Sequence, residues 1–160
     1  MQTTNLSPTL HGPATGKMLR PFAGQTTDGQ TIRSQSYRQR SNLVLLFHHG
    51  RDCAPCQAML ADIGAHIDEI QDQATAVLAI GPDGEARPFP MLTDPSGEIA
   101  KQQGLAAPAV VIVDRFGEIW AAWEGGADHH LPHADDVIEW LEFLEVQCPE
   151  CEPPEPWGDE

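Results

Sequence analysis

The stretch "NLVLLFHHGRDCAPCQAML", residues 42–60, joins an apolar run to a helical pattern, and two cysteines lie at the junction. The first half is continuously apolar and contains Val and Phe, which is typical of a central strand buried on both faces. From Cys53 onward, apolar residues recur at steps of three and four and lay one apolar face along a helix. These residues are Met59, Leu60, Ile63, Ile67 and Ile70. The stretch therefore predicts a buried strand that leads into a helix with Cys53 at its start.

The rest of the chain alternates strands and helices in the same way. An N-terminal hairpin is expected around Asp28-Gly29, a dipeptide suited to tight turns. The later expected elements are strands at 75–80, 108–114 and 118–123, a short helix from Asp94-Pro95 to Gly104, and a helix from 135 or 136 to about 146. Buried strands that alternate with helices predict the α/β class, and the closing hairpin makes the central sheet mixed.

Length and composition predict one domain with loose ends. The chain has 160 residues, enough for a single core. Residues 1–15 are polar and contain Pro and Gly, and residues 148–160 form an acidic, Pro-rich tail that cannot pack by itself. We expect a loose segment at 1–15, a domain at 16–147, and a tail from 148 that carries a second Cys-x-x-Cys pair.

The charge is strongly negative and excludes some classes of partner. The net charge is −15, and no Lys or Arg follows Arg115, so the chain should repel nucleic acid and anionic membranes. No stretch approaches the roughly 20 apolar residues that span a bilayer. The N-terminus lacks the basic and apolar blocks of a secretion signal, so a cytoplasmic location is expected.

The position of Cys53 and Cys56 favours thiol chemistry. Unpaired N–H groups and the helix dipole at a helix start favour the thiolate, which is the nucleophile. Arg51 would add to this effect and Asp52 would oppose it. Cys56 lies about one turn further along the same face, within reach of a mixed disulfide on Cys53. Two alternatives stay open: zinc, which would need two further ligands, or a pair of small buried residues.

Several segments resemble the redoxin family, the alkyl hydroperoxide reductase and thiol-specific antioxidant proteins with a thioredoxin-like fold. Residues 42–60 are similar to the family's active-site segment. "DGQTI" (28–32), "FPMLTDPSGEIAKQQGL" (89–105) and "PAVVIVDRFGEIW" (108–120) follow in the family's order, so the likeness covers roughly residues 16 to 145. The resemblance implies a thioredoxin-like fold in which Pro108 is a cis-proline facing the cysteines, with Ala107 beside it in the substrate groove.

The sequence departs from typical peroxiredoxins at three positions. The family pattern Pro-x-x-x-Thr-x-x-Cys has Leu46 and Gly50 here at the Pro and Thr positions, and the Arg before the late strand is Ala107. In the family, Thr and Arg orient the peroxide and stabilise charge as the O–O bond breaks. We therefore predict a thiol–disulfide oxidoreductase without an organic cofactor. A slow thiol-dependent peroxidase using Cys53, and a non-catalytic redox-sensing or metal-binding module, remain alternatives.

The second pair, Cys148 and Cys151, has three interpretations. The two residues could form a second dithiol that passes electrons to the first, they could be incidental, or they could bind Zn²⁺ with histidines from the loop at 129–133. The intervening helix of about a dozen residues would separate these groups by roughly 15–18 Å, which argues against one zinc site within the chain.

Residues beside the first pair are candidate auxiliaries. His48 and His49 end the expected strand with side chains on opposite faces, so one of them could transfer protons near Cys53. Gly50 and Arg51 complete this set. The expected partner is a protein or small-molecule disulfide or thiol. The sequence names neither the electron donor nor the oligomeric state.

Overall fold

The apolar run at the start of residues 42–60 forms strand β3 (Asn42–Phe47), in which all six residues are buried. The computed structural model describes residues 17–126 and 131–146. The expected end segments, together with Cys148, Cys151, His129 and His130, therefore lie outside the described residues. Strand β3 is central in a seven-stranded sheet of order β2-β1-β5-β4-β3-β6-β7. The other strands are β1 (Ala23–Thr26), β2 (Thr31–Arg33), β4 (Thr75–Gly81), β5 (Met91–Thr93), β6 (Ala109–Val113) and β7 (Ile119–Glu124).

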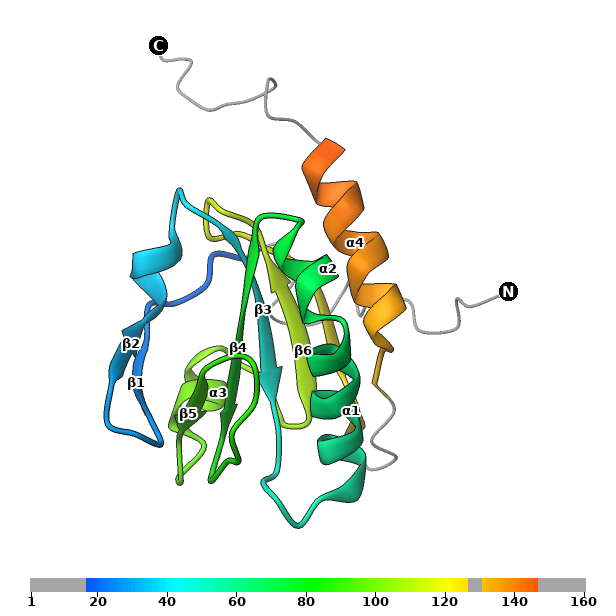
Figure 1. Ribbon diagram of the computed structural model, residues 1–160. Coiled ribbons are helices and arrows are strands. Elements are labelled where there is room, and N and C mark those ends of the chain that lie inside the picture. The colour runs from blue at the N-terminus through cyan, green and yellow to red at the C-terminus, as the bar shows by residue number, and fades with distance from the viewer. Residues whose placement is uncertain (1–16, 127–130, 147–160) are drawn as a thin grey trace.

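The sheet is mixed, as predicted. β3 pairs parallel with β4 and antiparallel with β6, and β6 continues antiparallel to β7. On the other side β5 is parallel to β4, and the β1–β2 hairpin attaches to β5 in the antiparallel sense. The expected N-terminal hairpin is therefore part of the main sheet, which can be followed at the left of Figure 1.

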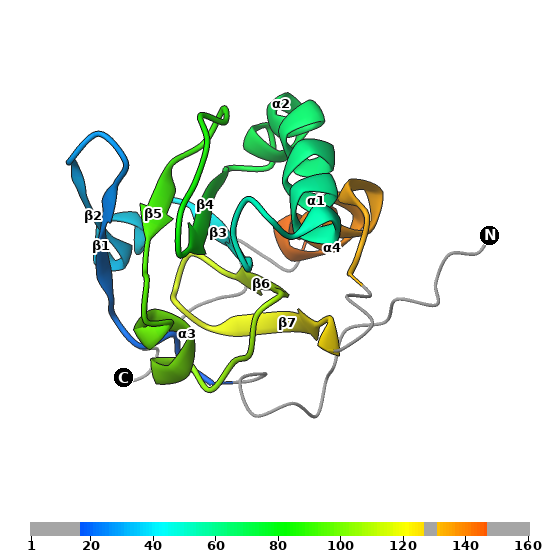
Figure 2. The same ribbon diagram turned by 90° about the horizontal axis from the view of Figure 1, so that it is seen from below.

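Helices cover both faces of the sheet. Helices α1 (Ala54–Ala65), α2 (Ile67–Gln71) and α4 (Ala134–Val146) lie on one face, and the short α3 (Glu98–Gln102) lies on the other (Figure 2). Alternate residues of β3 supply the two cores, because side chains along a strand point to opposite faces. Val44 and Leu46 pack with α1, α2 and α4, whereas Leu45 and Phe47 pack with α3. The predicted α/β class is confirmed.

Several details differ from the sequence-based expectation. Strand β3 ends at Phe47, before the two histidines expected at its end, and α3 begins at Glu98 rather than at Asp94-Pro95. The single helix expected from Cys53 to Ile70 is two helices, α1 and α2, which meet at His66 with a non-helical backbone (φ −112°, ψ 19°). Strand β5 was not expected. It has only three residues, which is too short for a periodic pattern to reveal.

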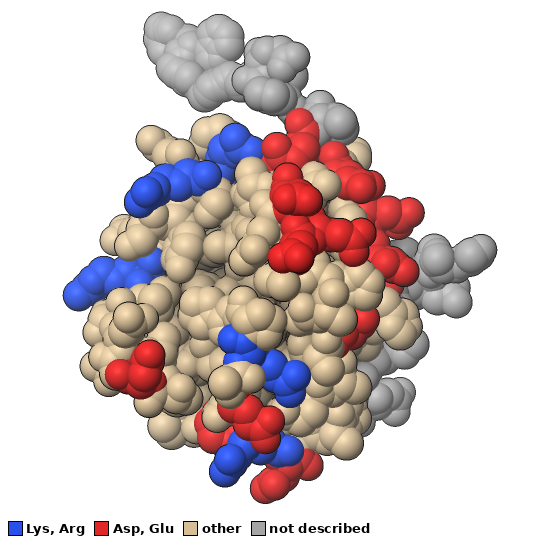
Figure 3. Space-filling model, viewed as in Figure 1, with Lys and Arg blue, Asp and Glu red and all other residues tan. Residues whose placement is uncertain are grey.

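Acidic side chains gather over α4, whose sequence carries five of them (Figure 3). They are Asp135, Asp136, Glu139, Glu142 and Glu145. Such a surface disfavours anionic partners near this helix. Among the described residues, no helix combines the length and the apolar character that crossing a membrane requires.

Candidate dithiol site

The two cysteines lie at the start of α1, at the carboxyl end of β3. Cys53 is the residue before the helix and has an extended backbone (φ −98°, ψ 102°), and its carbonyl accepts the N–H of Gln57 at 3.0 Å. Pro55 lies in the first turn, where a missing N–H costs no hydrogen bond. Cys53 is partly exposed and Cys56 is buried, and both are free cysteines. The structure thus places the pair at the predicted strand-to-helix junction, with only Cys53 open to solvent.

The environment of Cys56 keeps its sulfur protonated. Burial raises the pKa of the Cys56 thiol to about 12, and a side-chain hydrogen bond with Cys53 acts in the same direction. The backbone N–H of His49 donates to Cys56 Sγ at 3.3 Å and opposes the rise, because it stabilises the thiolate. The buried, protonated sulfur of Cys56 suits a resolving thiol, and the accessible sulfur of Cys53 suits an attacking one.

His49 and Ala107 lie in the loops next to the cysteine pair, His49 after the end of β3 and Ala107 before the start of β6. A ring nitrogen of His49 and the two Sγ atoms all lie within 4.8 Å of one another. His49 Nε2 lies 2.9 Å from the carbonyl oxygen of Ala107. The Ala107–Pro108 peptide bond is cis, and β6 begins directly after it, with Ala109 paired to Phe47. The register of β3 and β6 therefore brings the proline loop to the same edge as the cysteines, and the groove role of Ala107 and Pro108 remains a prediction.

His48 points to the opposite face and anchors the loop before Cys53. It is 2% exposed, and its Nδ1 accepts the N–H of Gly50 at 3.0 Å. Burial lowers the pKa of His48, so the ring is neutral, and its Nδ1 can act as the acceptor. The ring packs against Gly81, where an added Cβ would overlap it. Gly50 has a φ of +107°, which glycine adopts without strain.

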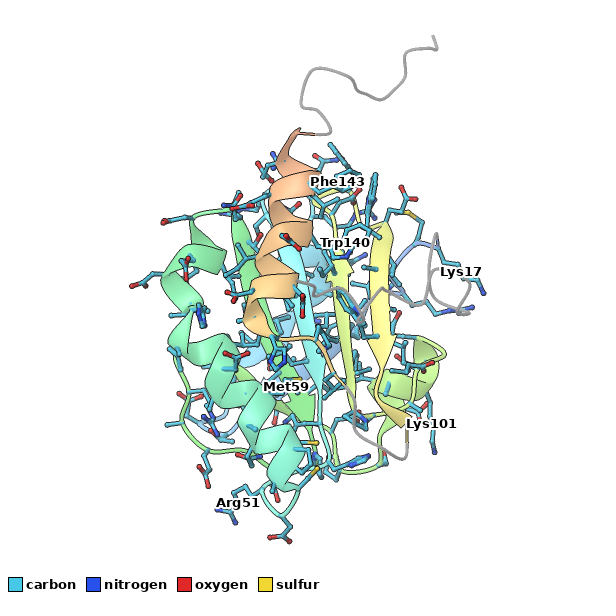
Figure 4. The ribbon with its side chains drawn as sticks, turned by 90° about the vertical axis from the view of Figure 1, so that its right-hand side faces the viewer. Lys17, Arg51, Met59, Lys101, Trp140 and Phe143 are labelled. Carbon is cyan, nitrogen blue, oxygen red and sulfur yellow. The ribbon has the colours of Figure 1, made fainter. Side chains whose placement is uncertain are left out.

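Polar side chains hold the same loop from outside. The N–H of Arg51 donates to Asp83 Oδ1 at 2.8 Å, and the Arg51 guanidinium lies 4.0 Å from the same carboxylate. Figure 4 shows Arg51 pointing outward beside the start of α1. Gln57 Nε2 donates to the Gly50 carbonyl at 3.0 Å, and Arg87 donates to Gln57 Oε1 at 2.9 Å. The Arg51 guanidinium is thus directed to Asp83, and its effect on the Cys53 thiolate remains a prediction.

Some predicted residues are not brought to this site, and others were missed. Of the loop histidines, His133 is described; it is exposed, with Nδ1 3.9 Å from Asp62 Oδ2. Gly81 and Gln57, which hold the loop before Cys53, were not predicted to belong to the site. No sequence motif marks them, because their roles come from contacts between the ends of β3, β4 and α1.

Comparisons with known proteins concern the family and the fold of the chain. A family model described as "AhpC/TSA family" matches residues 15–122. The fold is similar to that of the Plasmodium vivax 2-Cys peroxiredoxin, with a TM-score of 0.75 and 12% identity over 86% of this chain and 88% of that chain. It is also similar to Mycobacterium tuberculosis AhpC, with a TM-score of 0.70 and 20% identity over 86% of this chain and 97% of that one.

A third similar structure is the peroxidoxin BcpB from Mycobacterium tuberculosis, with a TM-score of 0.69 and 16% identity over 82% of this chain and 97% of that chain. No curated protein matched the sequence. At these identities the solved structures establish the shared fold alone. The fold is thioredoxin-like, as the resemblance implied.

Proposed function

The chain belongs to the AhpC/TSA family, and from this premise we propose that it is a thiol–disulfide oxidoreductase that uses Cys53 and Cys56. Family membership supports a thiol-based redox enzyme. The asymmetry of the pair supports the finer assignment, because Cys53 is partly exposed whereas Cys56 is buried with a pKa of about 12. In this proposal Cys53 attacks and Cys56 resolves.

The exchange proceeds in two displacements. The Cys53 thiolate attacks one sulfur of a substrate disulfide, the S–S bond breaks, and one substrate thiolate leaves and takes up a proton. Cys56 then attacks Cys53 Sγ, forms the protein disulfide and releases the second substrate thiolate. The dithiol loses two electrons and the substrate becomes two thiols.

Cys56 must lose its proton during the second displacement. His49 is positioned to accept it, because one of its ring nitrogens lies within 4.8 Å of both sulfurs. The Ala107 carbonyl, 2.9 Å from Nε2, orients the ring. We assign His49 this proton-transfer role, which the sequence suggested for one of the two adjacent histidines.

A thiol-dependent peroxidase is the second candidate, and the likeness to solved peroxiredoxins favours it. In that reaction Cys53 would attack a peroxide oxygen, the O–O bond would break with release of alcohol or water, and Cys56 would resolve the sulfenic acid to a disulfide plus water. The site lacks the family's Thr hydroxyl, because Gly50 is at that position, and Ala107 offers no guanidinium. We therefore expect peroxide to be the slower substrate.

The test is reduction of insulin disulfides by the reduced protein. Wild type should catalyse it, and Cys53→Ser should abolish it. The double variant Cys148→Ser/Cys151→Ser is the matched control and should retain the activity. If Cys53→Ser performs like wild type, the proposal fails. Peroxide consumption measured in parallel decides between the two candidates.

A further inference from the structure

The three side chains to which we assign roles in the exchange reaction also form a potential metal-binding set. They come from two elements: His49 follows β3, and Cys53 and Cys56 begin α1. A ring nitrogen and the two Sγ atoms lie within 4.8 Å of one another. Sequence spacing supplied only two of these ligands, so the third is a product of the fold.

The spacing is close to what zinc needs. Zn–S bonds of about 2.3 Å and Zn–N bonds of about 2.0–2.1 Å place tetrahedral ligand atoms about 3.5–3.8 Å apart. Ligand atoms within 4.8 Å reach that geometry with shifts of about 1 Å, which side-chain rotation supplies. The His49 ring already contacts a backbone carbonyl, that of Ala107 at 2.9 Å. A carbonyl contact of this kind orients metal-binding histidines.

Charge also permits a divalent cation here. The helix N-terminus carries about half a positive charge, which opposes a cation, but two thiolates carry two negative charges and neutralise Zn²⁺. Arg51, two residues before Cys53, is directed to Asp83 at 4.0 Å. Burial of Cys56 disfavours its thiolate in the metal-free protein, and a bound metal ion reverses this preference by coordinating the deprotonated sulfur.

We propose that the reduced dithiol binds Zn²⁺ through Cys53, Cys56 and His49, and that formation of the Cys53–Cys56 disulfide releases the ion. His49 is exposed and Cys53 is partly exposed, so the ion enters from solvent and a water completes four-coordination. Zinc therefore blocks the attacking sulfur, and the site couples thiol redox state to metal occupancy. This inference rests on the proposed function only for the release step.

The chemistry balances as two reactions. The dithiol plus Zn²⁺ gives the zinc dithiolate and two protons. The zinc dithiolate plus a substrate disulfide and two protons gives the protein disulfide, two substrate thiols and free Zn²⁺. The substrate disulfide is the oxidant in the second reaction, and it accepts the two electrons that the thiolates lose.

The test uses the full chain with Cys148→Ser and Cys151→Ser, so that only the first pair supplies thiolates. The reduced protein is titrated with Co²⁺, which reports thiolate ligation by a charge-transfer absorption band, and the Co²⁺ is then displaced with Zn²⁺. We expect one equivalent to bind, and no band after oxidation to the disulfide or in Cys53→Ser or Cys56→Ser. His49→Ala should weaken binding at least about tenfold, whereas His133→Ala, an exposed histidine away from the pair, should leave it unchanged.

Absence of the thiolate–cobalt band in the reduced protein would overturn the proposal, and so would equal affinity of His49→Ala and its parent. Far-ultraviolet circular dichroism of each variant verifies folding. The binding measurement requires no turnover, so it fails separately from the proposed enzyme activity. A protein that reduces insulin but binds no metal refutes this inference alone, and one that binds metal but leaves insulin intact refutes the proposed activity alone.

Discussion

Cys56 should be strongly protected from alkylation in the folded protein. Its pKa rises from the ordinary 9.0 to about 12, so below pH 9 its thiolate fraction falls about a thousandfold. A more basic thiolate is also a better nucleophile. For a Brønsted coefficient of about 0.4–0.5, this effect increases the alkylation rate of the thiolate about 15- to 30-fold. The net slowing is about 30- to 60-fold, and because the side chain is 0% exposed, steric protection adds to it.

The assay measures iodoacetamide alkylation at pH 8 by intact mass. It uses protein with Cys148→Ser and Cys151→Ser, and it compares Cys53→Ser, which leaves only Cys56, with Cys56→Ser, which leaves only Cys53. Each protein is also alkylated in urea, which supplies the rate of the same thiol without the fold. Cys53→Ser removes the thiol hydrogen bond and the charge of Cys53, both of which raise the pKa of Cys56, but it keeps burial, the largest cause.

We expect Cys56 in Cys53→Ser to react at least about tenfold more slowly in the folded than in the unfolded protein, because burial, the largest cause of its raised pKa, remains. We also expect much weaker protection for Cys53, which is partly exposed. If Cys56 reacts within about threefold of its unfolded rate, the Cys56 thiol is not protected by burial. The assignment of Cys53 as the attacking thiol and Cys56 as the resolving thiol would then be wrong.

Three further predictions concern the frame of the site. Gly81→Ala should lower the free energy of unfolding by about 1–3 kcal/mol, because the new methyl group overlaps the His48 ring. The control is Gly64→Ala in α1, which should not destabilise, because the added Cβ meets Pro88 at an ordinary contact distance of 3.5 Å. Equal stability of both variants in urea titrations would contradict the packing. Burial holds the pKa of His48 below its ordinary 6.5, so the unfolded chain binds the proton more readily than the folded protein does. The stability that the neutral His48 ring contributes is therefore complete above about pH 6.5 and is lost as the pH falls below that value. Comparing wild type with His48→Asn from pH 8 to pH 5 should show a smaller pH-dependent loss in the variant, and parallel curves would refute the buried neutral ring. Asp94→Ala should cost about 0.5–2 kcal/mol in the same titrations, because its carboxylate accepts the first two N–H groups of α3; an unchanged midpoint would contradict this capping role.

The strands of the central sheet were predictable because burial on both faces leaves a continuous apolar run. The predicted strand ran through His49, and the observed β3 (Asn42–Phe47) matches its apolar part but ends two residues earlier. Strand β5 was not predictable, because its three residues gain their place from pairing with β4 and β1 rather than from their own pattern. The break at His66 was hidden for a similar reason, since Ile67 and Ile70 continue the apolar spacing across it.

The site was predictable in part. The cysteine spacing and the change of period located the dithiol at a strand-to-helix junction, and alternation along the strand placed His48 and His49 on opposite faces. The different contacts of the two histidines could be identified only from the structure. His48 accepts the Gly50 N–H because Gly81 on β4 leaves room for its ring, and His49 meets the proline loop because β6 pairs with β3.

The central claim is that an accessible sulfur captures a disulfide and a buried neighbour releases it. Intact-mass analysis of Cys56→Ser after exposure to a small disulfide tests this most directly, in protein that also carries Cys148→Ser and Cys151→Ser. We expect one stable mixed disulfide on Cys53, whereas protein that retains Cys56 should lose two mass units and keep no adduct. A Cys56→Ser protein that forms no adduct, or a protein with Cys56 that keeps its adduct, would contradict the account.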